Sequence, residues 1–162
     1  MGRLAKILGK YAPGHVLEHG GKAYTFLPMS NAQICGIEKA LYKRDRDRIR
    51  GYYEDKEFDE TDYKRFLAEL RDKDEAGYYD LLGQAATRCF STASGRHVLL
   101  SHVLGCSPDE ATVLLRERTV ECIELLQVVY FETFPDARKE ALAKDVDEEG
   151  EQSLPPSGTK IG

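Results

Sequence analysis

Residues 15–41, HVLEHGGKAYTFLPMSNAQICGIEKAL, decide how the first part of this 162-residue chain folds. Two short runs of β-favouring residues flank the pair Gly20-Gly21. A Gly-Gly loop supplies the positive φ angles that a tight hairpin turn requires, so the pattern predicts a β-hairpin over 15–27. The apolar face of this hairpin is expected from Val16, Tyr24 and Phe26.

A helix is expected directly after the hairpin. Ser30 is a favourable N-cap residue, and Gln33, three residues later, completes a capping-box pattern. Ile34, Ile37 and Leu41 then recur at helical spacing. The sequence therefore predicts the order hairpin, short polar linker, amphipathic helix.

A charged stretch follows this first helix. Residues 43–50 hold five bases and two acids, a composition that alone could bind phosphate. The acids within 54–62 outnumber the single base, Lys56, by six to one, so the local charge nearly cancels. We interpret the stretch as a solvated helix end followed by a loop around 51–60.

The remaining sequence up to residue 143 predicts more helices, about five in all. The strongest start signal is Ser107, with Pro108 at the first helical position and Glu110 closing a second capping box. Other helix starts are expected at Thr61, Ser94 and Thr119, and breaks at Gly77, Gly105 and Pro135. In the last of these helices the recurring apolar residues are Val120, Ile123, Leu126, Val129 and Tyr130.

The two ends of the chain read differently from its middle. Residues 1–14 are expected to be a flexible N-terminus with a frayed first turn. Residues 144–162 are expected to be a disordered acidic tail, because the composition of this tail offers too little apolar area to offset the entropy of ordering. The prediction is a mainly α fold: one small helical domain over 15–143 with an N-terminal β-hairpin.

No residue pattern points to chemistry. The sequence holds no nucleophile elbow, phosphate-binding glycine loop or paired-histidine zinc motif, so we expect neither an enzyme nor a cofactor. His15 and His19 could share one face of a strand, but no third metal ligand is indicated. The four cysteines lack metal-site spacing and are expected to be buried free thiols.

Charge and hydropathy limit the classes of partner. The formal net charge of −5 argues against a nucleic-acid partner, and no apolar stretch approaches the roughly 18 residues of a membrane span. Residues 94–118 could form a helix–turn–helix. Asp109 and Glu110, at the start of its second helix, would repel a DNA duplex, so a DNA-binding regulator is the less favoured alternative.

The order of these elements resembles small tail assembly chaperones of long-tailed (siphovirus-type) bacteriophages. In that family a hairpin of the type GGK-x-Y-x-F runs into a polar cap and a helix, as residues 15–41 do here. Residues 94–126, SGRHVLLSHVLGCSPDEATVLLRERTVECIELL, are similar to the family's second half, in which an apolar helix precedes a Ser/Thr-Pro helix start and a final helix. The resemblance covers about 15–134.

The resemblance implies a non-enzymatic helper of the host cytoplasm that binds the helical tape measure protein and recruits tail tube subunits, with a homo-oligomer possible. The binding face is expected where large apolar residues crowd a helix beyond what one face can hold. The candidate protein-binding residues are Tyr78, Tyr79, Val129, Tyr130, Phe131 and Phe134. The alternative is a structural virion component such as a head–tail connector or neck protein.

Overall fold

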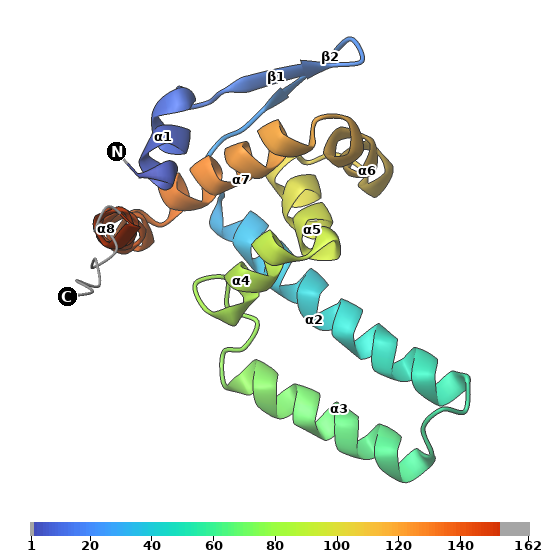
Figure 1. Cartoon of the computed structure of the whole chain (residues 1–162). Helices are drawn as coiled ribbons and strands as arrows, with labels where there is room; N and C mark the ends of the chain where they lie inside the picture. Colours follow the sequence, from blue (N-terminus) through green and yellow to red (C-terminus); the bar gives the residue numbers. More distant parts are fainter. Residues whose placement is uncertain (1, 153–162) are drawn as a thin grey trace, which may run out of the picture.

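The computed structural model describes residues 2–152, which form eight helices and one two-stranded hairpin (Figure 1). The predicted mainly α fold with an N-terminal hairpin is confirmed. The elements are α1 (Arg3–Lys10), β1 (Val16–His19), β2 (Lys22–Thr25), α2 (Asn31–Glu54), α3 (Glu60–Glu75), α4 (Gln84–Ser91), α5 (Ala93–Leu104), α6 (Pro108–Glu117), α7 (Thr119–Thr133) and α8 (Pro135–Gln152).

The hairpin forms where the sequence predicts it, but with a different residue facing the core. Gly20 and Gly21 have φ angles of 59° and 75°, as a two-residue turn requires. The strands pair antiparallel with Leu17 opposite Tyr24. Leu17 therefore shares the inner face with Tyr24 and is buried, whereas Val16 lies on the other face and is 46% exposed. The expectation that Val16 faces inward was wrong.

Several helix boundaries follow the predicted signals. The capping box between Ser30 and Gln33 is present, and the Ser107 hydroxyl accepts a hydrogen bond from the Glu110 backbone N–H. Gly105 ends α5 in the left-handed region, with a φ of 61°. The first capping box, the Ser107 N-cap and the end of the helix at Gly105 are confirmed. The second capping box is not formed, because the Glu110 carboxylate accepts hydrogen bonds from Lys22 and Tyr24.

Two caps each lie two residues earlier than expected. Asp59, not Thr61, caps α3, because its carboxylate accepts the Asp62 N–H at 2.7 Å. Thr92, not Ser94, caps α5: its hydroxyl accepts the Gly95 N–H and also donates to a carbonyl at the end of α4. The loop expected around 51–60 accordingly shrinks to the residues between Glu54 and Glu60.

Helix α7 lies at the centre of the fold and packs against α1, α5, α6 and α8 (Figure 1). Its buried side chains occupy more than one face, which is the expected pattern for a helix surrounded by others. These buried residues are Cys122, Leu125, Leu126, Val128, Val129 and Tyr130.

Helices α2 and α3 form a helical hairpin that projects from this core, named the arm (Figure 1). The first half of α2 buries Ile37 and Leu41 against the core, and α3 packs on the second half. At the far end, Tyr53 stacks on Tyr63 with ring centroids 4.4 Å apart. The arm therefore has its own small apolar seam between two largely charged helices.

Helices α1 and α8 extend into both end segments that the sequence predicts to lack structure. Residues 3–10, expected to be flexible, form α1, whose first turn donates the Leu4 and Ala5 N–H groups to the Asp145 carboxylate. Asp145 belongs to α8, which extends the helical fold beyond residue 143 to Gln152. The rest of the predicted tail, residues 153–162, lies outside the described residues.

The cysteines are all free, and their burial differs. Cys89 and Cys122 are buried, as expected, and burial raises the pKa of each thiol to about 11. Cys106 is partly buried, and Cys35 on α2 is exposed, which corrects the expectation for that residue.

Candidate functional site

The six residues proposed as a protein-binding face lie mostly inside the protein. Tyr79, Val129 and Tyr130 are 2%, 1% and 7% exposed, so these three belong to the core and do not form a surface of this chain. The other three are half-buried and pack against the same core: Tyr78, Phe131 and Phe134. The expectation of a binding face is corrected for the three buried residues: helices cover α7, which carries Val129 and Tyr130, on several sides, and Tyr79 packs against Tyr42 and Asp45 of α2.

Tyr130 is the centre of an aromatic cluster. Its ring lies 5.3 Å from Phe90, 5.3 Å from Phe131 and 5.0 Å from Phe134, measured between centroids. Its hydroxyl donates a hydrogen bond to the Leu81 carbonyl at 3.3 Å. The cluster therefore joins α4, α7 and the start of α8, and its role in the structure is packing.

Tyr79 holds the base of the arm. Its hydroxyl donates to the Asp45 carboxylate at 2.5 Å, and Arg88 donates to the same oxygen at 3.0 Å. The Arg88 guanidinium also lies over the rings of Tyr78 and Tyr79. Burial, and then the hydrogen bond to Asp45, raise the pKa of Tyr79 well above its ordinary value, so the phenol stays a neutral donor.

A hollow of about 490 Å³ lies between α1 and α7. Its apolar lining includes Val120, which is 66% exposed, together with the half-buried Ile7 and Ile123. The basic residues of the lining all come from α1: Arg3, Lys6 and Lys10. Glu124 is the acid among its lining residues. An exposed apolar strip beside a row of cations therefore faces outward at this point.

A second hollow, of about 230 Å³, shares Ile123 with the first. Leu115 and Ala93 give it apolar lining, and Arg96 and Arg116 add positive charge. Because Ile123 lines both hollows, they form one continuous surface across α7. This surface, named the α7 surface, comprises Ile7, Ala93, Leu115, Val120 and Ile123 with the bases Arg3, Lys6, Lys10, Arg96 and Arg116.

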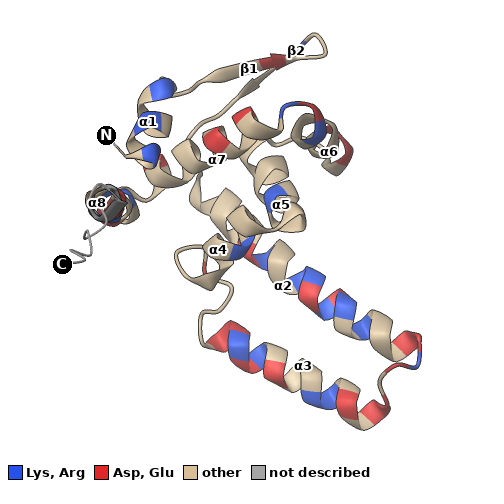
Figure 2. Ribbon diagram, viewed as in Figure 1, with Lys and Arg blue, Asp and Glu red and all other residues tan. Residues whose placement is uncertain are grey.

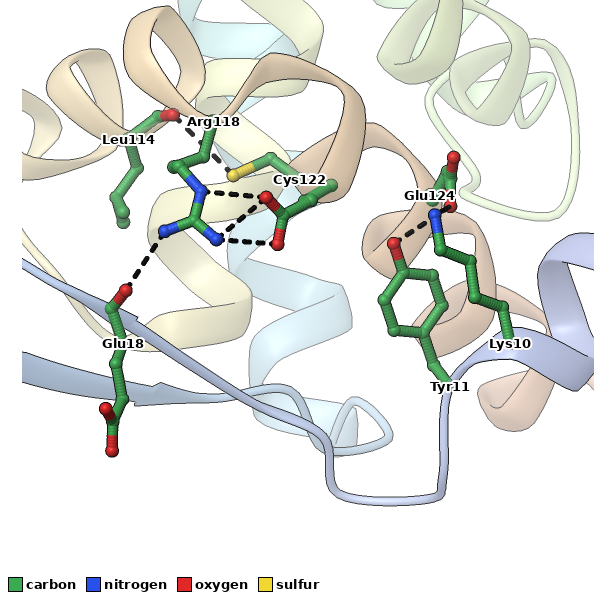
Figure 3. Close-up of polar contacts among 8 residues, drawn as sticks. Lys10, Tyr11, Glu18, Leu114, Arg118, Cys122 and Glu124 are labelled. Atoms are coloured by element: carbon green, nitrogen blue, oxygen red, sulfur yellow. Dashed lines mark hydrogen bonds and ion pairs between the residues drawn. The ribbon is translucent and has the colours of Figure 1, made fainter.

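The α1 side of this surface is fixed by polar contacts to α7 (Figure 3). The Tyr11 hydroxyl and the Lys10 ammonium donate to one oxygen of Glu124, at 2.9 and 3.1 Å. Desolvation by burial acts to raise the pKa of Glu124, but the hydrogen bonds from Tyr11 and Lys10 outweigh it and lower that pKa. Glu124 is therefore ionised at neutral pH and its charge is matched locally by Lys10.

Arg118 fixes the β-hairpin beside α7 (Figure 3). Its guanidinium donates to both carboxylate oxygens of Glu121 at 2.8 Å and to the Glu18 carbonyl at 3.1 Å. One residue thus joins the end of α6, the start of α7 and strand β1. Side-chain hydrogen bonds of Glu124 and Arg118 therefore fix the segments around the α7 surface, so the surface is preorganised for binding.

The hairpin also covers the start of α6. Lys22 and Tyr24 contact the Glu110 carboxylate at 2.7 and 3.0 Å. The α5–turn–α6 unit does have the lengths of a helix–turn–helix. The N-terminal end of its second helix, which such proteins insert among base edges, faces the hairpin here.

The histidines predicted to share a strand face contact different partners. His19 contacts Glu117 at 2.5 Å, and the His15 ring packs edge-on against Tyr11. Within residues 2–152, no group of three or more His, Cys, Asp and Glu side chains is placed to hold a metal ion. Over the same residues, no helix has both the length and the apolar character needed to cross a membrane.

Compared with known proteins, the chain matches no family model, no curated protein and no solved structure. Its function has to be inferred from its own residues and surfaces. The feature that departs most from an ordinary surface is the α7 surface: its lining has five bases and one acid, in a chain whose formal net charge is −5.

Proposed function

We propose that this protein is a non-enzymatic assembly chaperone of a bacteriophage tail, and that the α7 surface binds a helical stretch of the tape measure protein. The sequence resemblance supplies the class of client. The α7 surface offers a binding site for this client: an exposed apolar strip on α7, flanked by basic residues, whose lining comes from helices. Recruitment of tail tube subunits and action in the host cytoplasm belong to the same proposal.

The single observation that carries this proposal is the exposure of Val120 between Ile7 and Ile123. A valine that is 66% exposed is ordinary alone, but here half-buried apolar neighbours continue the strip on both sides. An amphipathic helix laid along the strip would bury these side chains by the helix-in-groove mode, at about 25 cal/mol for each Å² of apolar surface removed from water. The flanking bases favour a helix whose apolar stripe is bordered by Asp and Glu.

Co-expression tests the proposal. The tape measure protein encoded by the same genome is produced with a tagged wild-type chain, and its soluble fraction and its co-purification are measured. We expect the wild-type chain to raise both. Val120→Asp should abolish the effect, because a carboxylate in the apolar strip cannot be desolvated without cost.

Val146→Asp is the matched control. Val146 lies on α8 and is 65% exposed, nearly the same as Val120, but it does not line the α7 surface. This variant should support the tape measure protein as the wild type does. The proposed site would be contradicted if Val120→Asp bound the tape measure protein as well as the wild type does. It would also be contradicted if Val120→Asp and Val146→Asp lost this binding to the same extent.

Purified virions separate the chaperone from the alternative of a structural component. A chaperone acts before the tail is complete, so mass spectrometry of purified particles should detect no stoichiometric amount of this chain. A fixed copy number per virion would instead identify a connector or neck protein.

A further inference from the structure

We propose that the tip of the arm of one copy docks on the α7 surface of a second copy, so that the protein associates head to tail. The arm tip is defined as residues 52–63, the end of α2, the start of α3 and the turn between them. This inference uses the α7 surface but does not depend on which client that surface binds.

The charges of the two surfaces are opposite. Residues 54–62 carry six acids and one base, whereas the α7 surface carries five bases and one acid. Figure 2 shows red segments gathered at the end of the arm and blue segments along α1. Opposite potentials of this kind steer association and fix its orientation.

Some of the tip's acids are already engaged within the arm, and others are available. Asp59 caps α3, Glu60 pairs with Lys64, and Asp62 pairs with Arg65. Glu54 and Glu57 are exposed, and within the described residues neither has an ion-pair partner. These two carboxylates are free to face bases of another molecule.

Some bases of the α7 surface are likewise paired with acids, and others are not. Lys10 is matched by Glu124 at 3.1 Å, and Arg116 lies 3.6 Å from Glu117. Over residues 2–152, Arg3 and Lys6 have no acidic partner within ion-pair distance. The α1 side of the apolar strip therefore carries more positive charge than its one lining acid, Glu124, can neutralise.

Apolar surface is present on both sides of the proposed contact. Tyr52 and Tyr53 at the tip are 40% and 38% exposed, and Val120 on the α7 surface is 66% exposed. The Tyr52 ring packs on Phe58 and the Tyr53 ring stacks on Tyr63, so these aromatic groups are held in place before binding. Aromatic side chains fixed in this way contribute area at small cost in conformational entropy.

The turn at the tip is also ordered. Lys56 adopts a left-handed conformation with a φ of 59°, and its N–H donates to the Tyr53 carbonyl at 3.1 Å. The next N–H, of Glu57, donates to the Tyr52 carbonyl at 2.9 Å. The turn therefore presents Glu54 and Glu57 beside the two tyrosines as one rigid unit.

The tip cannot reach the α7 surface of its own chain. The arm projects away from α1 and α7 (Figure 1), and α2, with 24 residues, is a rod of roughly 36 Å. The contact must therefore join two copies. Because the two surfaces differ, the association is heterologous, and it continues from copy to copy unless it closes into a ring.

Complementation of two defective variants tests this arrangement. Glu54→Lys/Glu57→Lys reduces the net charge of residues 54–62 from −5 to −1 and replaces the two unpaired carboxylates by bases, and Val120→Asp disables the α7 surface. Molar mass is measured by light scattering after size-exclusion chromatography. We expect the wild type to gain mass with concentration, and to lose at least tenfold in association constant between about 50 mM and about 500 mM salt, where the Debye length falls several-fold. Each variant alone should stay monomeric.

The mixture is decisive. One variant retains an intact tip and the other an intact α7 surface, so an equimolar mixture should form a 1:1 heterodimer and nothing larger. Circular dichroism and melting temperature of each variant confirm that it is folded, and Val146→Asp serves as the exposed-valine control. A wild type that is monomeric at all concentrations, or variants that fail to complement while folded, would overturn the proposal.

The result is separable from the proposed function. If the wild-type chain self-associates but does not bind the tape measure protein, the chaperone proposal alone is contradicted. Persistence of self-association in Val120→Asp would contradict the docking proposal alone, since the tip would then bind elsewhere. If both proposals are correct, the tape measure protein should dissociate the assemblies, because it competes for the same surface.

Discussion

Replacing Leu17 by Ala should destabilise the protein far more than replacing its neighbour Val16. Leu17 is 2% exposed and lies opposite Tyr24 on the inner face of the hairpin. Val16 is 46% exposed on the outer face. Truncation of a buried leucine costs about 2–5 kcal/mol, from lost transfer free energy and the cavity left behind, whereas an exposed position costs less than about 0.5 kcal/mol.

The assay is urea and thermal unfolding followed by circular dichroism. For a chain of this size, about 1 kcal/mol shifts the melting temperature by roughly 2–4 °C, so Leu17→Ala should lower it by about 5–15 °C and Val16→Ala by no more than about 2 °C. The slope of the unfolding free energy with urea should be unchanged.

Equal effects of the two substitutions, or a larger effect for Val16→Ala, would refute the register. A larger effect for Val16→Ala would mean that the strands pair one residue out of step, since a shift of one residue exchanges the two faces of a strand. A small effect of both would instead show that the hairpin is not part of the cooperative core.

Three further outcomes are expected. Tyr79→Phe should lower the free energy of unfolding, measured by urea denaturation, by about 1.5–3 kcal/mol, because it removes a hydrogen bond to a charged group. Tyr78→Phe should change that free energy by less than about 0.5 kcal/mol. A similar loss in both variants would contradict the structure. The pKa of Glu124 in the folded protein lies below its ordinary 4.5, so its stabilising contribution is complete above pH 4.5 and is lost as the pH falls through the lower folded value. Glu124→Gln should therefore weaken the decrease in unfolding free energy at acid pH. An unchanged decrease would contradict the contacts of Glu124 to Lys10 and Tyr11. Mass spectrometry after maleimide treatment should find Cys35 modified first and Cys89 only after unfolding. The Cys89 thiol is buried and has a pKa of about 11, so only about one part in a thousand is thiolate at pH 8. Early labelling of Cys89 would contradict its buried position.

The hairpin shows how far local sequence signals reach. The Gly-Gly pair fixes a two-residue loop, and that loop alone fixes His19 opposite Lys22 and hence Leu17 opposite Tyr24. The correct inward residue was therefore available from the sequence. Val16 is apolar and β-branched, but register, not residue type, determines which face a side chain occupies.

The chain ends show where local signals fail. Helix α1 is short, and its first N–H groups are capped by Asp145, about 140 residues away in sequence. Isolated helices of eight residues are marginal in water, so α1 depends on tertiary contacts with α7 and α8. No local pattern in residues 1–14 carries that information.

The site shows the same limit. Crowded aromatic residues on α7 indicated a binding face, but the surrounding helices bury Val129 and Tyr130. Val120 and Ile123 fit the core periodicity of the same helix, yet they line a surface because α7 is open on that side. The bases around them come from α1, α5 and α6, and only the folded chain brings them together.

Site-specific photo-crosslinking tests most directly the claim that the α7 surface binds a helical client. Val120 is replaced by p-benzoylphenylalanine, Val146 is replaced likewise as the control, and each chain is irradiated in the presence of the tape measure protein. We expect cross-links to that protein from position 120 and none from position 146. Cross-links from both positions alike, or from neither in a complex that still forms, would contradict that claim.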